Sequence, residues 1–194
     1  MEEKDYRNIH QPVLMREVVD LLSPRAGAVI VDGTIGMGGH SEALLSAHPT
    51  IEIIGIDRDE DALSIAKKRL ASFGDRVRLV HGNYRDCVDL LSALDIDRID
   101  GFLLDLGLSS LQLDRPERGF SFRASGPLDM RMDRTSGPSA ADLVNDASAE
   151  ELSGIISRYG EERFAHRIAS AIVAARTKGR IETTDELAEI VYDA

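Results

Sequence analysis

The first half of the chain alternates short apolar runs with segments of helical periodicity, and this alternation limits the possible folds more than any other feature. Runs that are apolar at nearly every position are typical of strands buried on both faces. Strands that alternate with helices are joined by right-handed crossovers and form a parallel sheet. We therefore predict an α/β fold with strands at 28–32, 51–57, 76–80 and 99–105.

The segments between the strands predict helices at 13–22, 41–47, 59–73 and 86–94, the third with Asp59 as its N-cap. The pattern changes after the fourth strand. Residues 106–138 are rich in Gly, Pro, Ser, Asp and Arg and show no period, and an unstructured segment of that length is usually functional. From Ser139 onward helices are expected near 140–145, 149–157, 163–175 and 185–192. Ser148 is expected to open a capping box, and Thr184 to mark the start of the last helix. The predicted domains are 1–108, a substrate loop at 109–138 and a helical part at 139–194.

Acidic residues lie at the ends of three of the four predicted strands: Asp32, Asp57 and Asp105. In parallel α/β sheets ligands bind outside the carboxyl ends of the strands. One carboxylate at that edge is unremarkable by itself, but three together indicate a binding site there.

The turn after the first strand contains four glycines in the run from Gly33 to Gly39 and leads into a helix. Glycines let the backbone approach a ligand closely. The dinucleotide fingerprint fails because Ser41 stands where its third glycine should be, and the lysine of a P-loop is missing. An acidic residue followed by spaced glycines instead resembles the first motif of class I methyltransferases. The alternative is a tight strand-to-helix turn without a ligand.

Asp57 and Tyr84 follow the second and third strands. Asp57 lies nineteen residues after Gly38, the usual place of a carboxylate that accepts both hydroxyls of a ribose. Tyr84 could stack on an adenine ring, and the alternative is a half-buried core tyrosine.

Asp105 is the weak catalytic candidate. Enzymes that methylate exocyclic base amines place hydrogen-bond acceptors after the fourth strand, where they hold the amino hydrogens and align the nitrogen. The Asp/Asn-Pro-Pro-aromatic motif of many such enzymes is missing, so this likeness is positional. Cys87, the single cysteine, is interpreted as a buried structural residue rather than the nucleophile of ring-carbon methylation.

The chain has a formal net charge of −11, which argues against non-specific binding of polyanions. Basic residues nevertheless concentrate between Ile156 and Ile181, so either a structured RNA partner or a merely solvated helix face fits. One cysteine, no long apolar run and a polar N-terminus favour a cytoplasmic protein without membrane contact. No metal site is expected. The basic residues are Arg158, Arg163, Arg167, Arg176, Lys178 and Arg180.

These motifs together resemble the bacterial MraW family, also called RsmH, whose members methylate the exocyclic amine of a cytosine in the decoding centre of 16S ribosomal RNA. The resemblance covers nearly the whole chain, and ERGFSF (117–122) with GPLDMRMD (126–133) is its most specific part. It implies a class I, Rossmann-like fold with neighbouring first and fourth strands and an inserted helical subdomain. It also implies 16S ribosomal RNA within the small subunit as partner and S-adenosylmethionine as cofactor, held by Gly38, Gly39, His40, Asp57, Tyr84, Asp105 and Gln112. The other matching stretches are HQPVL (10–14), DGTIGMGGHS (32–41), GIDRD (55–59), HGNY (81–84), DGFLLDLGLSSLQLD (100–114), YGEERFAHRIASAIV (159–173) and TTDELAEIV (183–191).

Members of that family continue beyond the point that matches Ala194 and return to the sheet with further strands. We therefore expect this chain to hold an incomplete sheet with 99–105 as an edge strand, and to be poorly stable and inactive by itself. Two alternatives remain: a methyltransferase acting on DNA or a small molecule, and a non-catalytic remnant that binds only cofactor or RNA.

Overall fold

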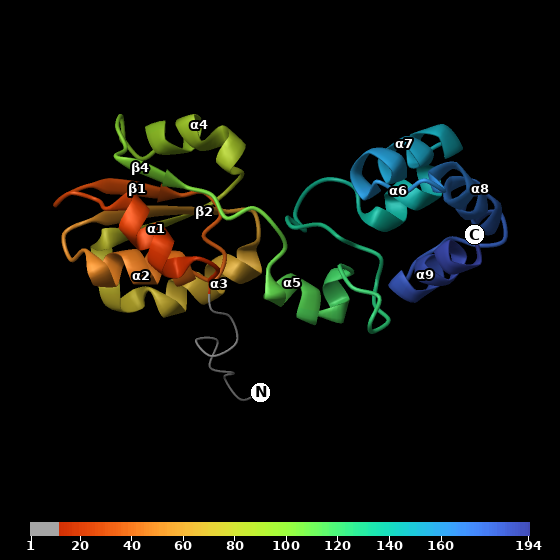
Figure 1. Ribbon diagram of the computed structural model, residues 1–194, viewed down its shortest axis with the longest axis horizontal. Coiled ribbons are helices and arrows are strands. Elements are labelled where there is room, and N and C mark those ends of the chain that lie inside the picture. The colour runs from red at the N-terminus through yellow and green to blue at the C-terminus, as the bar shows by residue number, and fades with distance from the viewer. Residues whose placement is uncertain (1–11) are drawn as a thin grey trace. The chain divides into compact units, whose positions relative to one another are not determined.

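The computed structural model describes residues 12–194. They form two compact units, one ending at Gly107 and the other beginning at Leu108. The first unit is built on a parallel sheet in the order β3-β2-β1-β4, and Figure 1 shows helices on both of its faces. The predicted α/β fold, with the first and fourth strands side by side, is confirmed. The strands are β1 (Val29–Asp32), β2 (Glu52–Asp57), β3 (Val77–His81) and β4 (Gly101–Leu103).

The helices of the first unit cover the two faces of this sheet. They are α1 (Met15–Leu22), α2 (Gly39–Ala47), α3 (Glu60–Arg69) and α4 (Cys87–Ser92), with the short 3-10 helices η2 (Ala71–Arg76) and η3 (Tyr84–Asp86). Successive strand residues point to opposite faces. Ile30 packs in one apolar cluster with Leu44 of α2, and side chains of α1 and α3 add to it. The next residue, Val31, packs in a second cluster with Leu91 of α4. Burial on both faces explains the continuous apolar runs.

The largest differences from the predicted lengths in this unit are in α3 and β4. Asp59 caps α3 as expected, and its carboxylate accepts from the backbone nitrogen of Asp61 at 3.0 Å. The helix does not continue to Phe73, because the chain turns into η2, where Gly74 has a positive φ of 57°. Strand β4 ends two residues before Asp105, since its ladder with β1 ends at the last residue of β1.

The second unit is helical. The predicted helices after residue 139 are confirmed, with ends that differ by up to three residues. The expectation that 106–138 lacks regular structure was wrong in part, because α5 and η4 lie within it. No helix within residues 12–194 is long and apolar enough to cross a membrane. The elements are α5 (Ser110–Asp114), η4 (Pro116–Arg118), α6 (Ala140–Asp146), α7 (Ala149–Gly160), α8 (Ala165–Arg176) and α9 (Thr184–Asp193).

An apolar core of its own holds this second unit together. Leu152 of α7 and Ile168 and Ile172 of α8 pack with Leu128 and Ile181 from the connecting segments. The segment between η4 and α6 is anchored by a buried arginine. Arg118 is 1% exposed, and its Nη2 donates to the backbone oxygens of residues 131 and 132 at 3.1 and 3.0 Å. The long segment is therefore folded against the helices.

Side-chain caps define the helix starts in this unit. Ser148 opens the predicted capping box of α7. The start of α9 was predicted one residue late, because Thr183 is its N-cap and Glu186 accepts from the backbone nitrogen of Thr183 at 3.0 Å. Thr184 is buried instead, and its Oγ1 accepts from the backbone nitrogen of Gly126 at 3.3 Å. This bond joins α9 to the loop that precedes α6.

Candidate functional site

The glycine loop after β1 is fastened to three strands at the carboxyl edge of the sheet. The backbone nitrogen of Gly33 donates to Leu103 O at 2.9 Å, and that of Ile35 donates to Ile56 O at 3.1 Å. The backbone nitrogen of Asp105 in turn donates to the hydroxyl of Thr34 at 2.7 Å. A loop held this way has little freedom left to lose when a ligand binds.

Three glycines of this loop have different reasons to be glycine. Gly36 and Gly38 have positive φ angles of 52° and 82°, a region that side chains rarely adopt. A Cβ on Gly38 would also lie 3.0 Å from the side chain of Leu70, whereas a Cβ on Gly36 would meet nothing closer than Thr34 O at 3.8 Å. A Cβ on Gly39 would collide with the ring of Pro12. The open side of the loop is therefore at Gly36.

Asp57 is the last residue of β2, and its carboxylate is hydrogen-bonded to this loop. Its Oδ2 accepts from the backbone nitrogen of Gly36 at 2.7 Å, and its Oδ1 accepts from that of Asp59 at 3.0 Å. Burial raises the pKa of Asp57 above its ordinary value, although these two hydrogen bonds oppose the shift. Each carboxylate oxygen has a second lone pair, so Asp57 can still accept from a ligand hydroxyl.

Asp32 is the most deeply buried carboxylate of this edge, at 2% exposure. Its Oδ2 accepts from the hydroxyl of Ser41 at 2.7 Å, which ties the end of β1 to the first turn of α2. Burial raises the pKa of Asp32 to about 6; the hydrogen bonds from Ser41 and Thr34 lower it, and the charges of Asp57 and Asp105 raise it. Burial is thus the main reason that Asp32 favours its protonated form.

His40 and Asp105 lie across the loop from each other. His40 Nε2 is 3.6 Å from Asp105 Oδ2. The imidazole is almost fully buried, with 9% of its side chain exposed, whereas 51% of the Asp105 side chain is exposed. The buried ring can thus orient a carboxylate that remains accessible to a ligand.

Tyr84 follows β3 at the start of η3. It is 37% exposed, so part of the residue reaches the surface. A Cβ on Gly33 would lie 3.0 Å from the Cβ of Tyr84, which places the tyrosine beside the glycine loop. Six of the seven predicted cofactor residues thus belong to the first unit, and they lie on or next to this loop.

The seventh, Gln112, belongs to the second unit. It is 5% exposed, and its Oε1 accepts from the backbone nitrogen of Ser109 at 3.1 Å, which forms the capping box of α5. This role was not predicted. The spacing of Ser109 and Gln112, three residues apart, was the available signal.

The sequence did not lead us to predict two further residues at this edge of the sheet. Thr34 anchors Asp105 and Ser41 anchors Asp32, and neither was predicted to belong to the site. Only the spacing of Asp32 and Ser41 across the glycine turn could have suggested their contact. Cys87, the first residue of α4, is half-buried rather than fully buried, and it packs with Leu90 against the cluster that contains Val31 and Leu91.

The predicted basic stretch is not one continuous binding face. Arg176 donates to the backbone oxygens of Val144 and Ala147 at 2.9 and 2.7 Å, and so caps the end of α6. Arg180 forms an ion pair with Asp142 at 2.6 Å. Arg176 therefore has a structural role inside the unit, through its Nη1.

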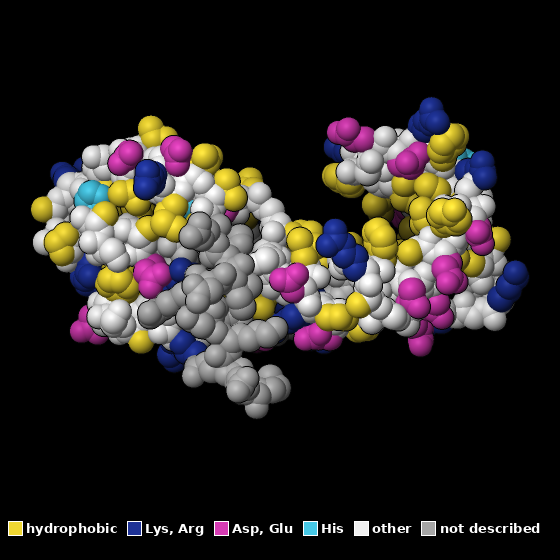
Figure 2. Space-filling view, turned by 60° about the horizontal axis from the view of Figure 1, so that its bottom comes forward, with side chains coloured by type: hydrophobic (Ala, Val, Ile, Leu, Met, Phe, Trp, Pro, Cys, Tyr) yellow, Lys and Arg dark blue, Asp and Glu magenta, His cyan; other side chains and the backbone are white. Residues whose placement is uncertain are grey.

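A separate apolar groove of about 780 Å³ lies in the second unit. Figure 2 shows hydrophobic side chains reaching the surface of this unit with acidic ones beside them. Phe122, Met130 and Tyr192 line the groove together with Glu189 and Asp193. It holds none of the residues predicted to bind a cofactor.

Comparisons with known proteins agree on one family. A sequence model of the MraW methylase family matches residues 7–194. The chain is 53% identical over 188 residues to "Ribosomal RNA small subunit methyltransferase H" of Thermobifida fusca, covering 95% of this chain and 57% of that protein. It is 54% identical over 186 residues to the protein of the same name from Geobacter sp., covering 95% and 60%.

A third relative of that name, from Saccharopolyspora erythraea, is 50% identical over 191 residues, covering 97% of this chain and 58% of the relative. The chain thus spans somewhat more than half the length of the curated relatives it matches. A solved structure described as a putative rRNA-methylase from Clostridium thermocellum is 22% identical, with a TM-score of 0.43, and covers 52% of this chain and 55% of that one. An overlap of that quality carries no inference about this chain.

Proposed function

The chain belongs to the MraW methylase family, and from this premise we propose that the protein transfers a methyl group from S-adenosylmethionine to 16S RNA of the small ribosomal subunit. The acceptor that we propose is the exocyclic amine of a cytosine in the decoding centre. The observation that carries the proposal is the glycine loop. Asp57 Oδ2 accepts a hydrogen bond from the backbone nitrogen of Gly36 in this loop at 2.7 Å, and the exposed carboxylate of Asp105 lies beside the loop.

The residues at this edge fit the proposed cofactor. The loop offers an open surface at Gly36, where a Cβ would meet nothing within 3.8 Å. S-adenosylmethionine carries a positive sulfonium and a positive ammonium group, and the carboxylates of Asp57 and the exposed Asp105 at this edge are suitable partners for them. When bound, the cofactor would supply an electrophilic methyl group.

The hydrogen-bond donors and acceptors at this edge of the sheet suggest a binding role for each residue. Asp57 would accept the ribose hydroxyls through its remaining lone pairs. Tyr84 would lie against the adenine through its exposed ring. Gly38, Gly39 and His40 would form the wall of the loop.

Asp105 would act on the acceptor amine. The lone pair of a cytosine amine is delocalised into the ring, so an acceptor that holds its hydrogens improves its alignment for attack. Asp105 is exposed enough to reach a base, and His40 at 3.6 Å would keep its carboxylate oriented. As the nitrogen gains the methyl group it must lose a proton, and Asp105 would be the first acceptor for it.

Small ribosomal subunits from bacteria that lack this activity provide the direct test. The subunits, the naked 16S RNA, a DNA of the same sequence and free cytidine are each incubated with the protein and methyl-labelled S-adenosylmethionine. We expect label on the cytosine amine of the subunit RNA, identified by mass spectrometry of the nucleosides. Label only on DNA or cytidine would show that one of these, and not ribosomal RNA, is the substrate. Cofactor binding without any methyl transfer would support the alternative of a non-catalytic binding protein. Asp105→Asn, which keeps the shape but adds amide hydrogens, should lower kcat more than cofactor affinity.

A further inference from the structure

We propose that the connection between α7 and α8 is a surface that stacks unpaired bases of single-stranded RNA on Tyr159 and Phe164. This inference deepens the proposed function, on which it rests, by naming where the RNA is held outside the cofactor site. Each ring is paired with the preceding arginine, Arg158 or Arg163.

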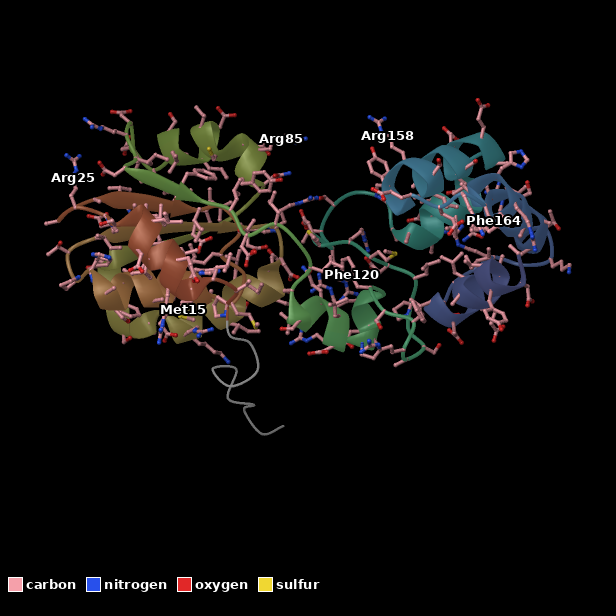
Figure 3. All side chains as sticks on the ribbon, in the orientation of Figure 1. Met15, Arg25, Arg85, Phe120, Arg158 and Phe164 are labelled. Carbon is pink, nitrogen blue, oxygen red and sulfur yellow. The ribbon has the colours of Figure 1, made fainter. Side chains whose placement is uncertain are left out.

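The two rings are exposed although they are aromatic. Tyr159 is 76% exposed and Phe164 is 48% exposed. The guanidinium of Arg158 lies 5.7 Å from the centroid of the Tyr159 ring, and that of Arg163 lies 4.5 Å from the centroid of Phe164. Figure 3 shows Arg158 projecting outward from the end of α7. Each pair combines an aromatic face with a positive charge at the surface.

The arginines of this connection differ from Arg176 and Arg180 in the same unit. Arg176 and Arg180 use their donors on backbone oxygens and on Asp142. Within residues 12–194, Arg158 and Arg163 form no ion pair with a carboxylate, and each contacts the ring that follows it. Their donors are therefore available for phosphate oxygens, which guanidinium groups bind well.

The arrangement suits single strands better than a duplex. Unpaired bases stack on aromatic side chains and on arginine, whereas the bases of an RNA duplex are stacked on each other and present mainly backbone and hydroxyls. Tyr159 and Phe164 are five positions apart, so their Cα atoms are at most about 18 Å apart. A short stretch of RNA is long enough to span this distance.

The charge of the apolar groove excludes it as the place for this stretch. Phe122 and Tyr192 are exposed there, but Glu189 and Asp193 line the same surface and would repel phosphates. Tyr192 is 91% exposed and provides an aromatic control on the same unit.

Fluorescence anisotropy with a short labelled single-stranded RNA tests the proposal, with its duplex form as the second probe. In the complete protein, Tyr159→Ala and Phe164→Ala should each weaken single-strand binding by at least about fivefold. Arg158→Gln with Arg163→Gln should reduce the slope of log affinity against log salt by about 0.7 for each lost phosphate contact. Tyr192→Ala and Lys178→Gln remove a ring and a charge elsewhere in the unit, and should change affinity less than twofold.

The outcomes separate this inference from the proposed function. Unchanged affinity in both ring variants would overturn the stacking surface, as would equal losses in the Tyr192 and Lys178 controls or a wild-type preference for the duplex. Cofactor affinity, measured by calorimetry, should be the same in all variants, and far-UV circular dichroism shows that they are folded. If the rings matter for RNA while no methyl transfer occurs, the surface stands and the proposed reaction fails. If transfer occurs at the wild-type rate with both rings removed and RNA affinity unchanged, the reaction stands and the surface fails.

Discussion

The Oδ2 atom of Asp57 lies 2.7 Å from the backbone nitrogen of Gly36, so the end of β2 holds the glycine loop that follows β1. The bond links two functions that the sequence suggested separately, a glycine turn and a ribose acceptor. A change at Asp57 should therefore alter both the loop and the proposed cofactor site.

Asp57→Ala should weaken the binding of S-adenosylmethionine by about ten- to a hundredfold. Loss of a charged hydrogen-bond acceptor costs about 1.5–3 kcal/mol, and tenfold corresponds to about 1.4 kcal/mol. Isothermal titration calorimetry measures the affinity directly. Glu52→Gln, at the opposite end of the same strand, is the matched control and should bind normally. Equal affinity in Asp57→Ala and wild type would reject the assignment.

Gly36→Ala and Gly38→Ala should separate ligand approach from packing. Both positions have positive φ, which costs a side chain about 1–2 kcal/mol. At Gly38 the new Cβ also lies 3.0 Å from Leu70, so we expect this variant to have the lower melting temperature. At Gly36 the methyl group points into open space, so cofactor affinity should fall more than stability does. Thermal unfolding and calorimetry on both variants check this order, and a Gly36→Ala protein that binds normally would show that the ligand does not approach there.

Asp32→Asn should flatten the dependence of stability on pH. The pKa of Asp32 is raised from 3.8 to about 6, so the native state favours the protonated form. The stabilisation of the native state by protonated Asp32 is complete at pH values below the ordinary pKa of the group. This contribution, roughly 3 kcal/mol at most, is lost as the pH rises through about 6. Urea unfolding between pH 4 and 7 should show this fall in the wild type and a smaller one in the variant.

Asp100 is the control for that measurement. Its pKa is lowered, first by the hydrogen bond from the backbone nitrogen of Val29 and then by the one from Arg25. The stabilisation from Asp100 is therefore lost only as the pH falls below the ordinary value. Asp100→Asn should show the same change in the free energy of unfolding between pH 4 and 7 as the wild type. If Asp32→Asn also showed the wild-type change, the argument from the burial of Asp32 would be wrong.

Arg176→Gln should destabilise the protein without a specific effect on RNA. The substitution leaves the backbone oxygens of Val144 and Ala147 without their charged donor, at a cost of about 1.5–3 kcal/mol. Arg167→Gln changes the same charge on an exposed part of the same helix, and should change the free energy of unfolding by less than about 0.5 kcal/mol. Chemical denaturation measures the free energy of unfolding of both variants. Similar values would contradict the structural role of Arg176 inside the unit.

Local sequence determined much of the first unit. The apolar run around Ile30 and Val31 predicts a strand because both residues are buried, one on each face of the sheet. Asp59 predicts a helix start because its carboxylate can reach the nitrogens of the next turn. Interactions within a few residues carry these signals, so they are readable without a fold. The family likewise follows from motifs that the sequence displays along its length.

Tertiary structure alone decided which of these groups meet. Ser41 and Asp32, Thr34 and Asp105, and Arg176 and Val144 are hydrogen-bonded pairs whose members have no local pattern in common. The basic stretch shows the limit most clearly. Arg163 and Arg176 carry the same charge in the same segment, yet one stacks on an exposed ring and the other caps a helix end. Charge is a property of the residue, but whether its donors are free depends on which backbone oxygens the folded chain brings within reach.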